Sequence, residues 1–296
     1  MLRRYLVLLR RQKRPVRFLV SRILLYSGLS RWLVIEKRGF RLRFYPTNAS
    51  AQQWVDPYHV HDKEHGDREE SFFRRYLRPG DVVVDVGANF GLTALAAFSA
   101  IGPTGQVHAF EPHPRIFRFL LGNIELNGAE SVVKAYNLAL GDRRGSVFLT
   151  DSRADDQNTV SKAPTGIRVP LSTLDDAVAA LPHIALLKID VEGYEKFVLE
   201  GATETLPRVD CVYFEAYSAN YAQHGYELRE IMDFLAEKGL EVRRIGAVNS
   251  NTFVRPGETF TEPENLVAVR DLDILRRRLE ESRWPEAGKT AVDRRP

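Results

Sequence analysis

A glycine-containing loop with an acid at its start has the composition of a cofactor-binding turn. The segment DVGANFG begins at Asp85, directly after an apolar run, and carries Gly87 and Gly91. Glycines let backbone N–H groups approach a ligand, and such a loop lies at the ligand-binding edge of a doubly wound sheet. Its GxxxG spacing differs from the GxGxxG fingerprint of dinucleotide sites. The acid would repel a pyrophosphate but suits a cationic, amino-acid-bearing ligand, which favours S-adenosylmethionine over NAD.

Two further acids follow the next two apolar runs. Glu111, in HAFEP, stands where an acid hydrogen-bonds the ribose hydroxyls of an adenosine cofactor. Asp142, in ALGD, suits an adenine amino group, although a turn around residues 141–145 explains it equally well. The alternative for Asp85 and Glu111 is that they only cap the helices that follow them.

A charged block ends a later apolar run, in LLKIDVEGYE. Strand alternation puts Lys188 and Asp190 on one side, with Glu192 in the loop beyond. Buried charges are costly unless paired, so both Lys188 and Asp190 are expected to have partners near a cleft. Methyl transfer to an alcohol needs an oriented nucleophile and removal of a proton, and Asp190 is the first candidate for that task. Lys188 and Glu192 complete the predicted catalytic set.

A divalent cation is the second interpretation of the same acids. Asp190 and Glu192, with Glu215 from YFEAY, offer oxygen ligands that suit Mg²⁺ or Ca²⁺. Charge complementarity with the next helix is the structural alternative for Glu192 and for Glu195. A histidine cluster, at positions 59, 61 and 65, is interpreted as a surface feature rather than a metal site.

The elements around these residues alternate between strand and helix. Expected strands cover residues 82–86, 106–110, 131–138, 184–189 and 210–214, with others near Glu241 and Leu266; expected helices cover 69–77, 92–101, 115–127, 194–206 and 228–238. This order predicts an α/β fold with a doubly wound, largely parallel sheet. The polar stretch from Asp151 to Gly166 is long enough to act as a substrate-recognising lid.

The first 45 residues are predicted to form an extension to this core. Residues 3–29 have helical spacing, and residues 32–45 indicate a hairpin with its turn at Arg38 and Gly39. Many arginines stand among the leucines, so the helix either docks on the main domain or contacts an anionic membrane surface or partner. The expected units are a cap at 1–66, a catalytic domain at 67–275 and a charged tail at 276–296.

Composition limits the class of protein. The chain has 296 residues, of which 44% are hydrophobic, and this is enough for one substantial domain. Its net charge is only +3. No apolar run reaches the roughly 18 residues of a membrane span, and no cleavage site follows an apolar stretch. The single cysteine, Cys211, cannot form an internal disulfide, so a reducing cytoplasm is expected, with peripheral membrane contact as an addition.

Together these motifs resemble the FkbM family of methyltransferases. The matching segments, from about Glu69 to Val269, are PGDVVVDVGANFG, HAFEPHP, LNGA, VPLSTLDD and LLKIDVEGYEKFVLEGA. The resemblance implies a seven-stranded Rossmann-like methyltransferase sheet and O-methylation of sugars, glycolipids, polysaccharides or other natural products. Matched residue by residue, the cofactor loop contains Asp85, Gly87, Asn89 and Gly91, the ribose acid is Glu111, and the acidic block contains Asp190, Glu192 and Glu195.

Two alternatives from other classes stay open. A nucleic-acid methyltransferase would use the basic arm to hold phosphates, but the nearly balanced charge and the absence of an NPPY or DPPY motif make nucleic acid an unlikely partner. A non-catalytic binding module with the same fold would not need the acids of both motifs. The favoured partner is a small-molecule or glycan acceptor.

Overall fold

The central element is a seven-stranded sheet in the order β12-β13-β11-β10-β3-β4-β5. The computed structural model describes residues 14–27, 30, 33–56, 68–151, 158–245, 254–255 and 257–281. Its strands are β3 (Val82–Val86), β4 (Gln106–Phe110), β5 (Val133–Tyr136), β10 (Ile184–Ile189), β11 (Val209–Ala216), β12 (Glu241–Arg244) and β13 (Glu264–Val269). Neighbouring strands from β11 to β5 are parallel, and β13 is antiparallel to both of its neighbours. The predicted seven-stranded fold is confirmed.

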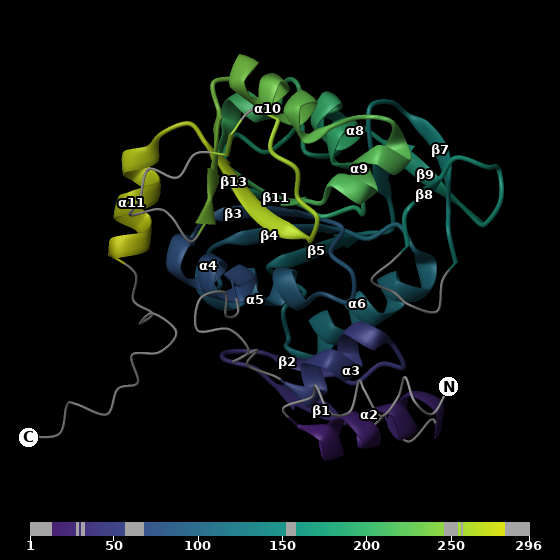
Figure 1. Ribbon diagram of the computed structural model, residues 1–296. Helices are drawn as coiled ribbons and strands as arrows, with labels where there is room; N and C mark the ends of the chain where they lie inside the picture. Colours follow the sequence, from purple (N-terminus) through teal and green to yellow (C-terminus); the bar gives the residue numbers. More distant parts are fainter. Residues whose placement is uncertain are drawn as a thin grey trace, which may run out of the picture.

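Helices cover both faces of the sheet (Figure 1). One layer contains α4 (Arg68–Tyr76), α5 (Leu92–Ile101) and α6 (Pro114–Leu126); the other contains α7 (Leu174–Ala177), α8 (Glu195–Glu200), α9 (Ser218–His224) and α10 (Leu228–Glu237). All six residues of β10 are buried, as expected of a central strand covered on both faces. Leu186 belongs to the apolar core on the α5 side, and Leu187 to the core on the α8 side.

An N-terminal unit packs outside the α6 layer. It contains α2 (Pro15–Ser27), β1 (Val34–Glu36), β2 (Arg41–Arg43) and α3 (Asn48–Val55). The predicted hairpin is confirmed, since β1 and β2 pair antiparallel. Backbone N–H groups of Arg41 and Arg43 each donate at 2.8 Å to the side chains of Asn127 and Asn123, at the end of α6. The extension is therefore joined to the core by specific polar contacts.

A second, four-stranded sheet lies beside the carboxyl end of β5. It contains β6 (Ala139–Leu140), β7 (Gly145–Leu149), β8 (Val160–Ser161) and β9 (Ile167–Ser172) in the order β6-β9-β7-β8. The sequence predicted one strand over 131–138 and a long polar segment after Asp151. None of these four strands was predicted, and β6 and β8, with two residues each, are too short to show an alternating pattern.

Helix α11 (Leu272–Glu280) closes the described part of the chain. It packs on α4, and Arg278 Nη1 lies 2.6 Å from Asp81 Oδ2 at the start of β3. The expected boundary at residue 275 thus falls inside a helix that contacts the core. Helix α8 ends at Glu200, earlier than the predicted 194–206, and at the next residue, Gly201, a Cβ would lie 2.0 Å from the Gly141 carbonyl oxygen. Among the described helices, none is long and apolar enough to cross a membrane.

Candidate active site

The loop after β3 is shaped by close backbone contact with the loop after β10. Gly87 has φ +77°, and a Cβ there would lie 1.8 Å from the carbonyl oxygen of Asp190. The N–H groups of Gly87 and Ala88 both donate to the Phe110 carbonyl at 3.0 Å. Asn89 also has positive φ, 50°, and its side chain accepts a hydrogen bond from Phe90 N–H at 2.7 Å. The glycine is therefore needed for the two loops to meet.

Glu111 joins the loops after β3 and β4. Its Oε2 accepts a hydrogen bond from Asn89 N–H at 2.9 Å, and its Oε1 accepts one from His113 N–H at 2.8 Å. Burial raises the pKa of Glu111 to about 7, although these two hydrogen bonds oppose the rise. The carboxylate is thus fixed in direction and has lone pairs left for a ligand.

A cavity of about 150 Å³ opens where these loops converge with the second sheet and the loop after β10. Its lining includes Gly87, Asn89, Glu111, His113, Leu138, Leu140, Leu149, Thr159, Asp190 and Glu192. The structure thus brings three predicted cofactor residues and two predicted catalytic residues to one hollow. A larger hollow of about 260 Å³ between α8 and α10 is lined by none of the predicted residues.

Lys188 lies beneath this cavity with its charge fully paired. Its Nζ donates to the Gly87 carbonyl at 2.8 Å and lies 3.2 Å from Asp85 Oδ1 and 3.4 Å from Asp190 Oδ2. Burial lowers the pKa of Lys188, but Asp85 and Asp190 more than reverse this and raise it above its ordinary value. Lys188 therefore remains an ammonium that holds Asp190 in position, and it does not accept a proton.

Asp85 is buried and is not among the residues that line the cavity. It is 0% exposed, and its Oδ2 accepts a hydrogen bond from Thr93 Oγ1 at 2.6 Å on α5. With Lys188 on its other oxygen, Asp85 fixes β3, β10 and α5 to one another. The contact between Asp85 and the cofactor that the sequence suggested therefore stays a prediction.

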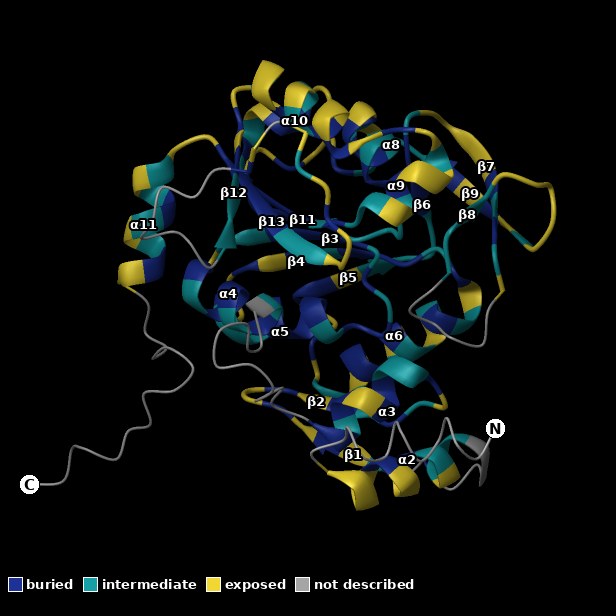
Figure 2. Ribbon diagram, viewed as in Figure 1, coloured by how far each residue is buried: buried dark blue, intermediate teal, exposed yellow. Residues whose placement is uncertain are grey.

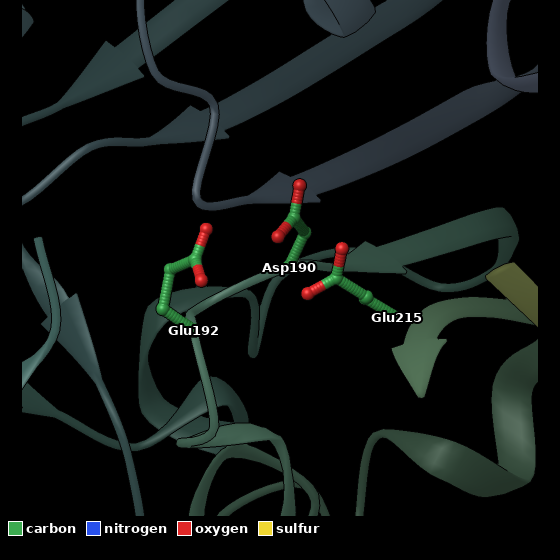
Figure 3. A group of neighbouring side chains, drawn as sticks. All are labelled: Asp190, Glu192 and Glu215. Carbon is green, nitrogen blue, oxygen red and sulfur yellow. The ribbon is translucent and has the colours of Figure 1, made fainter. Parts of the chain in front are cut away.

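Three carboxylates converge beside the cavity (Figure 3). Oxygens of Asp190, Glu192 and Glu215 all lie within 4.8 Å of one another. Glu192 has φ +55°, its Oε2 accepts from Asn220 Nδ2 at 3.0 Å, and its carbonyl accepts from Thr159 Oγ1 at 2.9 Å. Burial, and then repulsion from Asp190 and Glu192, raises the pKa of Glu215 to about 9. The three carboxyl groups are thus so close together that repulsion disfavours their full ionisation.

Two further glutamates belong to this acidic region. Burial raises the pKa of Glu69, at the start of α4, to about 8; Lys188 opposes the rise and Asp190 adds to it. Glu69 was missed because it precedes β3 and stands at no strand end. Glu195 is 1% exposed, and its Oε1 accepts from Val191 N–H at 3.0 Å and Gly193 N–H at 3.3 Å. Glu195 therefore fixes the loop that carries Glu192.

The remaining predicted residues lie apart from the cavity. Gly91 is the left-handed N-cap of α5 with φ 96°, and a Cβ there would lie 2.8 Å from Leu120. Asp142 forms an ion pair with Arg143 at 2.9 Å and does not line the cavity, so its adenine role stays a prediction. The histidine cluster at 59, 61 and 65 and part of the predicted lid, residues 152–157, lie outside the described residues.

The hairpin β7–β8 contributes cavity residues that lie within the predicted lid, residues 151–166, but were not singled out from the sequence. Asn158, Thr159 and Val160 line the cavity from β8 and the residues before it. On the β7 side of the hairpin, Asp151 Oδ1 lies 3.3 Å from His113 Nε2. The hairpin thus contacts both the Glu111 loop and the Glu192 loop. The only available signal was the length of the polar stretch between the flanking elements.

Comparison with known proteins agrees with this geometry. The model of the methyltransferase FkbM domain matches residues 85–242, more than half of the chain and all of the strand-end motifs described above. The 2-O-methyltransferase NoeI of Sinorhizobium fredii is 27% identical over 179 residues, 53% of this chain and 72% of that protein. The 31-O-demethyl-FK506 methyltransferase FkbM of Streptomyces tacrolimicus is 32% identical over 202 residues, 56% of this chain and 75% of that protein.

A third relative is the hexuronic acid methyltransferase AglP of Haloferax volcanii. It is 29% identical over 164 residues, 54% of this chain and 63% of that protein. The segment that the family model matches contains the glycine loop, Glu111 and the acidic block that converge on the cavity. The chain therefore belongs to the FkbM family and is an S-adenosylmethionine-dependent methyltransferase.

Proposed function

We propose that this protein transfers the methyl group of S-adenosylmethionine to a hydroxyl group of a sugar, a glycan, a glycolipid or another natural product. The observation that carries the proposal is the position of Asp190. It directly follows β10, it lines the cavity, and one of its oxygens lies 3.4 Å from the Lys188 ammonium. A carboxylate fixed in this way can orient an acceptor hydroxyl and take its proton.

The cavity residues fit the parts of the cofactor. The fixed oxygens of Glu111 suit two ribose hydroxyls, and the apolar side chains of Leu138, Leu140 and Phe110 suit an adenine ring. Gly87 and Asn89 would line the amino-acid end next to Asp190. When bound, S-adenosylmethionine supplies an electrophilic methyl group on a sulfonium.

The protein's own residues then have separate tasks in the proposed reaction. Asp190 receives the hydroxyl proton, and Lys188 keeps that carboxylate aimed at the cavity. Glu195 holds the following loop through Val191 and Gly193, so that Glu192 stays beside Asp190. Fixing the acceptor in this way removes much of the entropic cost of the reaction.

Several observations favour a hydroxylated acceptor. The lining of the cavity near Asp190 includes the polar side chains of Glu192, Asn158 and Thr159. One relative is named a 2-O-methyltransferase and another a hexuronic acid methyltransferase. The acids that gather here would repel the phosphates of a nucleic acid, which disfavours the nucleic-acid alternative.

We also propose that a divalent cation binds to the three carboxylates. The oxygens of Asp190, Glu192 and Glu215, within 4.8 Å of one another, match the hard oxygen ligands that Mg²⁺ takes. A cation there would offset the repulsion that raises the pKa of Glu215. It would also polarise an acceptor oxygen.

The acceptor class is tested with methyl-labelled S-adenosylmethionine and three acceptor sets: mono- and oligosaccharides, other hydroxylated natural products, and RNA. Label found on a saccharide or natural-product oxygen supports the proposal. Label found only on RNA would replace it with the nucleic-acid alternative, and cofactor binding without turnover on any set would favour a binding module.

A further inference from the structure

We infer that the outer face of α2 docks on an anionic lipid surface. Four large apolar side chains of this helix are exposed: Val16 at 71%, Leu19 at 43%, Val20 at 37% and Ile23 at 63%. Positions i, i+3, i+4 and i+7 lie on one side of a helix, so these residues form a continuous stripe. Figure 2 shows α2 at the outer edge of the molecule, with exposed residues on its outward side.

The fold itself does not account for this stripe. The opposite side of α2 packs on α3, with Phe18 and Ser21 buried and Leu25 packed against the main core. The helix therefore has an apolar inner face that stabilises the N-terminal unit and a separate apolar outer face. Among the described residues, the only other exposed large apolar side chains are Val34 and Leu121. An apolar stripe rimmed by polar residues marks an interaction site.

Charge decides which partner suits the stripe. At about 100° per residue, Arg17 and Arg22 fall on opposite flanks of it. Arg17 extends across the ring of Trp54, at 5.2 Å from the centroid, and Arg22 across that of Phe18, at 4.7 Å. Arginines at the border of an apolar face can reach lipid headgroups while the apolar side chains enter the acyl boundary.

The sequence around the stripe is positively charged. Residues 1–22 include eight lysines and arginines, and the first acid of the chain is Glu36. Basic residues near a surface add to its attraction for anionic lipid. Two copies of the chain meeting stripe to stripe would bring these arginines together, so repulsion disfavours a dimer through this face. An anionic bilayer offers acyl chains to the apolar stripe and negatively charged headgroups to the arginines beside it.

The test uses the full chain and sedimentation with vesicles of phosphatidylcholine, alone or mixed with phosphatidylglycerol. We expect binding to the mixed vesicles at about 0.05 M salt and a clear loss at about 0.5 M salt, because salt screens the arginines. The double variant Val16→Ser/Ile23→Ser should bind at least about tenfold more weakly. Leu121→Ser, an exposed leucine of α6, is the matched control and should bind like the wild type.

Cofactor affinity, measured on the same samples, should be equal in all three proteins, since none of these positions lines the cavity. This readout separates the lipid proposal from the proposed methyltransferase reaction. Equal vesicle binding by the double variant and the wild type would overturn the role of the stripe. A dimer seen by light scattering and lost in Val16→Ser/Ile23→Ser would assign the stripe to self-association instead.

Discussion

Lys188 and Asp85 face each other across two central strands, with Nζ 3.2 Å from Oδ1 and both side chains almost inaccessible to water. The two residues are register partners of β10 and β3, so the pair links the strands that carry the two loops of the cavity. The same ammonium contacts Asp190 and the Gly87 carbonyl. One buried cation therefore organises the cofactor loop and the candidate base together.

Replacing Lys188 by Met should lower the free energy of unfolding by about 3–5 kcal/mol, because it leaves Asp85 buried without its counter-ion. Urea denaturation followed by circular dichroism measures the change. The double variant Asp85→Asn/Lys188→Met should recover part of the loss, since the uncompensated charge is gone. A loss below about 1 kcal/mol in Lys188→Met would contradict the pairing described here.

The ribose role of Glu111 predicts a pH-dependent cofactor affinity. Its pKa is about 7 in the ligand-free protein, and hydrogen bonds from ribose hydroxyls favour the ionised form. Protonation below pH 7 should therefore oppose binding, and the Kd for S-adenosylmethionine should rise about tenfold from pH 8 to pH 6. Calorimetry at the two pH values measures this.

Glu111→Ala should weaken binding at pH 8 by about 1–3 kcal/mol and should remove most of the pH dependence. Glu130→Gln, on the exposed surface, is the control and should behave like the wild type. If the alanine variant keeps wild-type affinity, Glu111 does not hold the ribose.

The sequence predicted the sheet well because its strands are long and buried. Val82–Val86 and Ile184–Ile189 were identified with the bounds that the structure shows, each as an apolar run ending in a charged motif. The requirement for partners also followed from burial, since a charge such as Lys188 cannot stay unpaired inside a sheet. The sequence did not show that Asp85 is the partner of Lys188.

The rest of the site depends on tertiary contacts that leave little local pattern. Glu69 lies near Lys188 and Asp190 only because α4 packs along the sheet, and nothing in its own segment marks it. Thr159 reaches the cavity from a hairpin whose second strand has two residues. The amphipathic character of α2 was predicted from the sequence. Which face packs on the protein and which stays exposed became clear only from the contact of α2 with α3.

Thr159 should influence the acceptor more than the cofactor. Its hydroxyl donates at 2.9 Å to the carbonyl of Glu192, which helps to fix the acidic loop. Thr159→Val keeps the shape and removes this bond, so the KM for the acceptor should rise about two- to tenfold while the cofactor Kd stays constant. Thr203→Val removes a similar bond, to Glu200 on the exposed end of α8, and serves as the control. An unchanged KM in Thr159→Val would exclude this hairpin from acceptor recognition.

Metal dependence is tested by removal and return of the cation. If Asp190, Glu192 and Glu215 hold Mg²⁺, EDTA should abolish turnover and added Mg²⁺ should restore it. Added Mg²⁺ should also raise the melting temperature of the wild type, but not that of Glu215→Gln. Full activity in EDTA, with no Mg²⁺-induced stabilisation, would leave Asp190 to act directly.

The central claim is that Asp190 enables methyl transfer to an oxygen. The most direct measurement compares wild type and Asp190→Asn with labelled S-adenosylmethionine and an acceptor that the wild type methylates, following both label on the acceptor oxygen and cofactor affinity. Asp190→Asn keeps the shape but cannot take a proton, so turnover should fall about 100- to 10,000-fold while cofactor affinity persists. Near-wild-type turnover by Asp190→Asn on such an acceptor would contradict the mechanism and make the acidic block structural.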